Sequence, residues 1–168
     1  MPAGFPLKFT IAVPGQEAFV TALQRFAESI TDFTPFWFSY FLPTWFAYIS
    51  QSYASQGGST GSDWSPLSAA YAAWKAKRWP GQPIGVLTGR TRSSLTTLND
   101  PNAVLEMQPQ AFAVGTKLDY PIFLQLGTAR MPARPPMRIT QQFASVEVAK
   151  LLQKFGHDTL KAAKLGKE

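Results

Sequence analysis

The residues that could carry chemistry are few, and the only histidine is the first to consider. His157 stands beside Asp158 near the end of the chain. A serine–histidine–aspartate arrangement would have to use this histidine, in a helical tail that is the least anchored part of the sequence. We therefore interpret His157 as a solvated surface side chain and not as a general base.

The sequence also has no recognisable site for a metal ion or a phosphate group. The chain of 168 residues has no cysteine, and no two of its ten acidic residues stand at the spacing of metal ligands. The stretch from Gly85 to Arg90 contains glycines but lacks the Gly-Lys-Ser/Thr ending of a phosphate-binding loop. We expect no enzyme activity, no cofactor and no metal.

A proline-rich segment with evenly spaced arginines points instead to binding. The prolines that follow Gly127 exclude helix interior and central strand, because proline fixes φ and has no backbone donor. Arg130, Arg134 and Arg138 fall four apart along this segment, and guanidinium groups suit bidentate contacts. We predict a stiff, extended loop that presents these arginines to a partner. A connecting loop with merely solvated arginines is the alternative.

The most aromatic stretch, residues 33–53, contains two prolines and a polar end. A membrane span needs about 20 predominantly apolar residues, so we expect none here. Two interpretations remain open. The stretch is either a helix buried in the domain's own core or an interface between subunits, because one small domain can hardly enclose so many rings. On the second interpretation Trp37, Phe41 and Trp45 contact another chain.

The remaining pattern predicts a single α+β domain spanning residues 1–168, with several helices packed on a small antiparallel sheet and a long C-terminal helix. Gly156 lies inside that helix and is expected to weaken, divide or end it, at a cost of about 1 kcal/mol relative to alanine. In chain order the predicted elements are a strand at 7–13, a helix at 16–30 with Phe19, Leu23, Phe26 and Ile30 on its apolar face, a helix capped by Asp63 or Ser65 that closes at Pro80–Gly81, a short helix at 86–95, a hairpin of 103–108 with 111–116, and a helix from Ile139 or Gln141 to Leu165.

The chain is basic, with a net charge of +6 and a pI near 9.7. Four lysines of the predicted last helix, at 150, 154, 161 and 164, fall on one side at 100° per residue. Such a stripe is either a solvated face or a binding surface, and non-specific contact with DNA is one use for it. No recognised nucleic-acid-binding motif accompanies the charge.

Several short motifs occur in the order and spacing seen in one family of viral proteins, over about residues 56–140. The chain resembles the virion morphogenesis proteins of Mu-like and related tailed bacteriophages, which are tail-completion or neck proteins. Pro121 and Leu124 depart from the family, which usually has alanine and histidine at these places. The motif residues are Trp64, Pro66, Leu67, Tyr71, Trp74, Lys75, Thr88, Gly89, Arg90, Tyr120, Gln125, Gly127, Thr128, Pro132, Arg134 and Pro135.

The resemblance implies a non-enzymatic structural protein of the virion, made in the host cytoplasm, that forms a hexameric ring at the head–tail junction. Its partners would be the head connector or stopper and the tail terminator or tube proteins. The motif residues would then serve as fold and contact positions. A tail terminator, another tail-assembly protein and a basic nucleic-acid-binding module are the alternatives.

Overall fold

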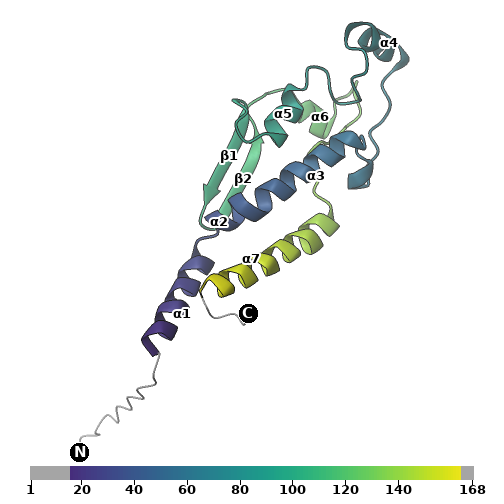
Figure 1. The fold of residues 1–168 in the computed structure, drawn as a ribbon. Helices are drawn as coiled ribbons and strands as arrows, with labels where there is room; N and C mark the ends of the chain where they lie inside the picture. The colour runs from purple at the N-terminus through teal and green to yellow at the C-terminus, as the bar shows by residue number, and fades with distance from the viewer. Residues whose placement is uncertain (1–15, 164–168) are drawn as a thin grey trace, which may run out of the picture.

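A central helical segment, residues 34–54, runs through the middle of the molecule (Figure 1). It comprises α2 (Thr34–Phe36), a π-helical turn η1 (Trp37–Phe41) and α3 (Leu42–Ala54). The computed structural model describes residues 16–163. The strand expected at 7–13 lies outside the described residues. Among those that are described, every helix is too short or too polar to cross a membrane.

The aromatic stretch contributes buried rings to the core of its own domain, and most of its other rings are half-buried. Phe36 is 0% exposed, Trp45 is 3% exposed and Tyr53 is 2% exposed. Trp45 stacks on Phe41, with ring centroids 6.1 Å apart, and both contact a ring of the last helix. The stretch therefore forms part of the domain's own core, as the buried-helix interpretation predicted, although Phe38 remains 52% exposed.

The predicted hairpin is confirmed. Strands β1 (Ala103–Gln108) and β2 (Ala111–Thr116) pair antiparallel, from Ala103 opposite Thr116 to Gln108 opposite Ala111. The turn between them is tied to the central segment, because the Phe33 N–H donates to the Pro109 carbonyl at 2.8 Å. The short helix α5 (Arg90–Thr96) packs on this sheet, and the Ser94 hydroxyl donates to the Thr116 hydroxyl at 2.8 Å.

The last helix packs along the central segment. A π-helical turn η3 (Phe143–Glu147) leads into α7 (Val148–Ala162), which contains Gly156 without a break, so the expectation that Gly156 divides or ends the helix is wrong. Phe155 fixes this helix through ring contacts with Phe36 and Tyr40. The packing of the neighbouring turns outweighs the intrinsic cost of one glycine.

The elements at the two ends complete an α+β domain. The predicted first helix is confirmed as α1 (Gln16–Thr31), although the side chains of Phe19 and Ile30 lie outside what the structure describes. Figure 1 shows α1 and α4 (Ala69–Arg78) at opposite ends of an elongated molecule. Two short helices, η2 (Gly58–Thr60) and α6 (Pro121–Leu126), lie nearer to the α4 end.

The start of α4 differs from the prediction. Ser68 is its N-cap and accepts a hydrogen bond from the Tyr71 N–H at 3.4 Å, whereas Asp63 and Ser65 precede the helix. The reason is Trp64, which is 6% exposed and packs into the core, so that the chain must run extended before the helix can begin.

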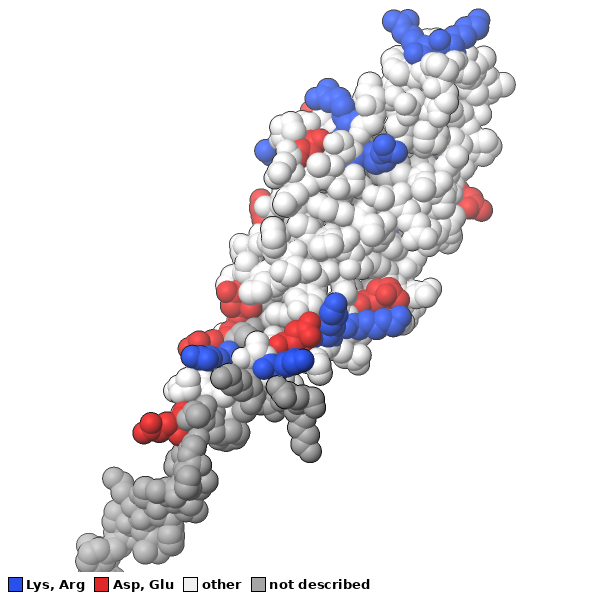
Figure 2. Space-filling model, viewed as in Figure 1, with Lys and Arg blue, Asp and Glu red and all other residues white. Residues whose placement is uncertain are grey.

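Charge is unevenly distributed along the molecule. In Figure 2 the tip formed by α4 carries basic side chains, the region around α7 and α1 mixes both signs, and much of the surface between them is uncharged. The candidate site lies next to this tip, between α4, the start of α5 and the segment 120–134.

Candidate functional site

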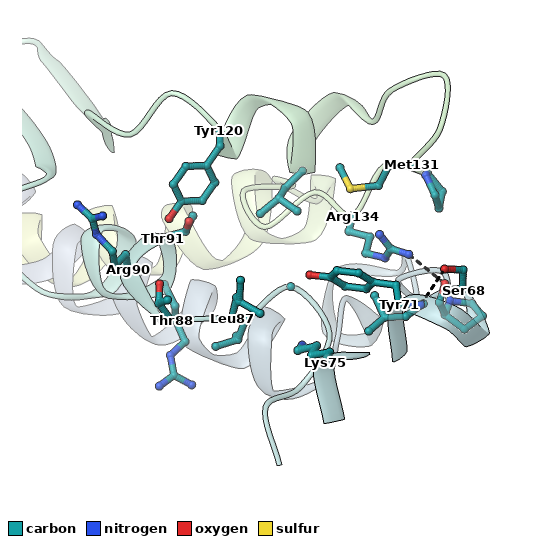
Figure 3. A pocket seen from close by; sticks show the side chains of 18 of the residues that line it. Ser68, Tyr71, Lys75, Leu87, Thr88, Arg90, Thr91, Tyr120, Met131 and Arg134 are labelled. Atoms are coloured by element: carbon teal, nitrogen blue, oxygen red, sulfur yellow. Dashed lines mark hydrogen bonds between the residues drawn. The ribbon is translucent and has the colours of Figure 1, made fainter. Parts of the chain in front are cut away.

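An open cavity of ≈ 660 Å³ lies between α4, the start of α5 and the segment 120–134 (Figure 3). Most of the family-motif residues line it, although they come from three separate parts of the sequence. The lining motif residues are Pro66, Leu67, Tyr71, Lys75, Thr88, Gly89, Arg90, Tyr120, Pro132 and Arg134.

The loop before α5 is held in place by the core. Trp64 packs edge-on against Tyr53, with ring centroids 5.3 Å apart. Gly85 lies against the same indole and has φ +78°, and a Cβ at this position would stand 2.6 Å from the Trp64 ring. Only glycine lets this backbone approach so closely, and the approach brings Leu87 and Thr88 to the cavity.

Arg134 does not project from its loop, which corrects the expectation that a partner meets it. Its side chain is 5% exposed, and its Nε and Nη2 donate to the Ser65 and Pro66 carbonyls at 2.8 and 2.9 Å. The Arg134 backbone N–H also donates to the Leu124 carbonyl at 2.7 Å. Arg134 therefore braces its own chain, by joining the proline-rich loop to the segment before α4.

The three arginines of that loop have different surroundings. Arg130 is exposed and lines the cavity, whereas Arg138 is exposed and does not line it. Contact of Arg130 and Arg138 with a partner stays a prediction. Of the three aromatic residues expected at an interface, Trp45 is already enclosed, while Trp37 and Phe41 are half-buried by Phe112 and their neighbours.

Lys75 forms a second buried cation at the cavity. It is 5% exposed, and its Nζ donates to the Pro83 carbonyl at 2.6 Å. Burial lowers the pKa of Lys75, and the nearby charge of Arg134 lowers it further. Since both buried cations are hydrogen-bonded to neutral carbonyls, their positive charges are solvated but not neutralised.

Two tyrosines and a leucine give the cavity an aromatic and apolar character. Figure 3 shows Tyr120 and Tyr71 extending from opposite sides toward the space above Leu87. The tyrosines are 44% and 41% exposed, respectively. Leu124 and Met131 also line the cavity. Sequence reasoning did not single out either of the last two as site residues, because neither carries a functional group or a helical spacing that would mark it.

The segment after Gly127 is a loop without helix, as the prolines predicted, and it is held by several contacts. Gly127 has φ +75°, and Thr128 and Met131 form an isolated antiparallel bridge that closes a tight turn. The side-chain oxygen of Gln125 accepts from the Met137 N–H at 3.3 Å. The motif residues Gln125, Gly127 and Thr128 shape the loop and do not line the cavity. Pro135 does not line it either.

Exposed apolar side chains occur on two helices that contribute to the cavity lining. On α6, Ile122 is 55% exposed, Phe123 is 53% exposed and Leu126 is 72% exposed. On α4, the motif residue Trp74 is 44% exposed and packs against Trp79, with ring centroids 5.1 Å apart. Large apolar side chains that stay exposed on a folded protein are typical of a surface that binds another protein.

The lining offers binding groups, and none of its residues is a histidine or a carboxylate. Within residues 16–163, no cluster of three or more His, Asp or Glu side chains could hold a metal. His157 lies on α7, exposed, with its Nδ1 3.6 Å from an Asp158 oxygen. The arrangement can bind an anionic or apolar group.

Fold and site together define a small α+β protein with an open, cationic and aromatic binding cavity. No family model, no curated protein and no solved structure matches the chain. The resemblance to phage tail-completion proteins therefore stays a prediction.

Proposed function

We propose that this protein is a structural assembly protein of the tail-completion or neck kind, which joins the head connector of a tailed bacteriophage to its tail. It acts by binding other proteins and not by catalysis. One observation carries the proposal: motif residues from three distant segments, including Tyr71, Arg90 and Tyr120, gather around a single open cavity. A shared surface is the expected result if these residues serve contact.

The proposed assembly is a homo-oligomeric ring, with six copies as the resemblance implies, in the virion at the head–tail junction. A closed ring requires two different complementary surfaces on each subunit. The α4 tip carries basic side chains, whereas both signs of charge occur around α7 and α1 (Figure 2), so the subunit offers surfaces of different charge for such contacts. The connector or stopper and the tail terminator or tube proteins are the proposed partners.

The test is the phenotype of phage particles that lack the protein. We expect filled heads and separate tails that do not form a stable joint, and infectivity restored by the intact gene. Light scattering and negative-stain imaging of the purified protein then show whether it forms rings alone or only on its partner. Normal joined particles without the protein would refute the proposal.

A nucleic-acid-binding module is the second candidate, and the exposed lysines of α7 favour it. Two contacts weaken this alternative. Lys150 is paired with Glu147 at 3.0 Å, and Lys154 lies over the Tyr40 ring near the Asp158 carboxylate. A gel-shift titration with duplex DNA at increasing salt tests this alternative. DNA binding that weakens steeply as salt rises would support it, because a basic surface binds DNA through its phosphates.

A further inference from the structure

The residues that line the cavity carry positive charges and no negative charge. Lys75 and Arg134 are each only 5% exposed. Three further cations, Arg90, Arg92 and Arg130, also line the cavity. No acidic residue lines it, and no ion pair within residues 16–163 involves any of these five cations. Clustered positive charge above a low-dielectric floor attracts an anionic group strongly.

The buried pair is partnered but not neutralised. Lys75 and Arg134 donate only to backbone carbonyls, and the positive charge of each opposes that of the other. Keeping two like charges buried is costly unless a counter-charge approaches. The positive charge of the buried pair adds to that of Arg90 and Arg130 at the cavity, and together they favour an anionic ligand.

The apolar part of the lining favours an anionic protein segment over nucleic acid as the ligand of the cavity. A cavity lined by Leu87, Leu124 and Met131 offers a place for an aliphatic or aromatic side chain. Interfaces with nucleic acid are polar and strongly charged over their whole area, whereas an apolar centre with arginines at its border is typical of protein interfaces.

We propose that this cavity is the docking site for an acidic, apolar peptide segment of a partner protein. A large apolar side chain of that segment enters between Tyr71, Leu87 and Leu124, and its carboxylates pair with Arg90 and Arg130 at the rim. The inference rests on the proposed assembly function, for which it supplies the chemistry of one partner.

A random peptide library provides the probe, since no partner segment is identified. The library is selected on the full-length protein, and an enriched peptide is then labelled with fluorescein and titrated by fluorescence anisotropy. We expect enriched peptides to combine Asp or Glu with Leu, Phe or Trp. Replacing their acidic residues by glutamine, or their large apolar residue by serine, is expected to weaken binding at least about tenfold.

Two charge reversals on the same loop form a matched pair. Arg130→Glu changes an exposed arginine that lines the cavity, and Arg138→Glu changes an exposed arginine that does not. We expect the first to weaken peptide binding at least about tenfold and the second to leave it within about twofold. Because both side chains are exposed, both variants should fold, which circular dichroism and thermal unfolding verify.

Three results would overturn the inference. Enrichment without acidic residues, or no enrichment, shows that the cavity does not select such segments. Equal weakening by both variants shows attraction by net charge alone. Competition by an oligothymidine at the peptide's own concentration range assigns the surface to nucleic acid. If the protein forms rings and joins particles while peptide selection fails, the proposed function stands without this inference; if the peptide binds but particles are normal without the protein, the inference stands without that function.

Discussion

A single arginine can serve the fold or a partner, and its hydrogen bonds decide which. Arg134 lies in a proline-rich loop and looks from its spacing like a surface contact, yet its guanidinium reaches two carbonyls 68 and 69 positions earlier in the chain. Arg130 lines the open side of the same cavity without such bonds in the described part of the chain. Contact with a partner is therefore proposed for Arg130 and not for Arg134.

Arg134→Ala is expected to lower the free energy of unfolding of the isolated protein by about 2 to 4 kcal/mol. Two charge-assisted hydrogen bonds are lost, and the carbonyls of Ser65 and Pro66 lose their donors. Urea denaturation measures the change. Arg138→Ala, at an exposed position, is the control and should alter stability by less than about 0.5 kcal/mol. An Arg134→Ala protein as stable as the wild type would show that this brace contributes little.

Tyr53 presents the opposite case, a buried polar group without a partner. Its hydroxyl makes no hydrogen bond within residues 16–163, and burial raises the pKa of Tyr53 well above the usual value for tyrosine. An unsatisfied buried donor costs about 1 to 3 kcal/mol. Tyr53→Phe should therefore leave stability unchanged or raise it by up to about 1 kcal/mol in urea denaturation.

Tyr48→Phe is the matched control for that substitution. The Tyr48 hydroxyl donates to the Arg138 carbonyl at 2.6 Å and accepts from the Thr140 N–H at 3.2 Å. Its removal should cost about 1 kcal/mol or more. If Tyr53→Phe is as destabilising as Tyr48→Phe, then the Tyr53 hydroxyl has a stabilising contact after all.

At the scale of elements, the two loops that border the cavity depend on glycine to different degrees. Gly127 and Gly89 have similar φ angles, +75° and +80°. A Cβ on Gly127 would stand 2.7 Å from the Ala133 backbone nitrogen, whereas a Cβ on Gly89 would meet nothing within 4 Å. The first position combines strain with a collision, and the second has strain alone.

Gly89→Ala is accordingly expected to cost about 1 to 2 kcal/mol of unfolding free energy, and Gly127→Ala at least about 2 kcal/mol more. Parallel urea denaturation of the two variants gives the difference directly. Because Arg130 and Arg134 lie on the same loop and line the cavity, a shift of this loop in the Gly127 variant should also weaken binding of an acidic peptide. Equal costs for the two substitutions would mean that the 127–134 loop shifts to accept a side chain.

The elements were predictable where the signal is local. The hairpin follows from two β-capable runs around Pro109, and the end of α4 follows from basic residues before Pro80. The start of α4 was misplaced because Ser65 and Pro66 have the composition of a helix start, while burial of Trp64 delays the helix to Ser68. Such burial depends on distant residues, which no local pattern reveals.

The cavity itself was not predictable from the sequence. Its motif residues were recognised, but their meeting requires the Gly85 backbone to lie against Trp64 and the Arg134 brace to draw in the proline-rich loop. The burial of Lys75 was equally hidden, since a lysine in the last turn of a helix normally extends into solvent. Tertiary contacts over long sequence separations created the site.

At the scale of the whole molecule, acid should destabilise the fold. Hydrogen bonds lower the pKa values of Asp32, Asp100 and Asp158, with the largest contributions from the side chains of Thr34, Ser93 and Tyr40, respectively. A carboxyl whose pKa is lower in the folded protein binds fewer protons there than in the unfolded chain. The stabilisation is therefore present above the unfolded pKa, and it is lost as pH falls through the folded value.

We expect the thermal midpoint to fall as pH is lowered from about 5 to about 2.5, and to fall less in Asp158→Asn. Asparagine can still accept the Tyr40 hydroxyl, which lies 2.8 Å from the Asp158 carboxylate, but it does not titrate. Asp119→Asn, which also removes one carboxylate but leaves this contact in place, is the control. Identical acid profiles for wild type and Asp158→Asn would exclude a linkage through this contact between α7 and the central segment.

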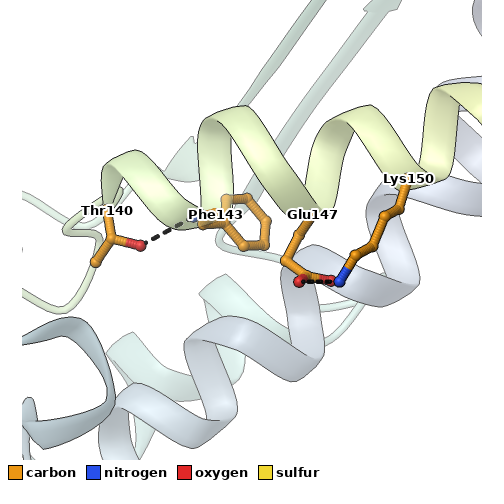
Figure 4. Close-up of polar contacts among 4 residues, drawn as sticks. All are labelled: Thr140, Phe143, Glu147 and Lys150. Atoms are coloured by element: carbon orange, nitrogen blue, oxygen red, sulfur yellow. Dashed lines mark hydrogen bonds and ion pairs between the residues drawn. The ribbon is translucent and has the colours of Figure 1, made fainter.

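The two π-helical turns of the core helices have a consequence for chain length. In η1 the Leu42 N–H donates to Trp37, and in η3 the Val148 N–H donates to Phe143, five residues back in each case. Figure 4 shows the Thr140 hydroxyl, which accepts from the N–H of Phe143, the first residue of η3. Each turn thus holds one residue more than an α-helical turn, without rotating the helix that follows.

A residue can consequently be removed from the central segment at one place and not at others. Deletion of the exposed Ser39 within η1 should leave a regular helix with Trp45 and Ile49 still facing the core, and cooperative unfolding should persist. Deletion of the exposed Ala47 within α3 should turn the residues on one side of it by about 100° and abolish the fold. Natural relatives one residue shorter are therefore expected to have their gap at the π-helical turn, where a length difference leaves the core intact.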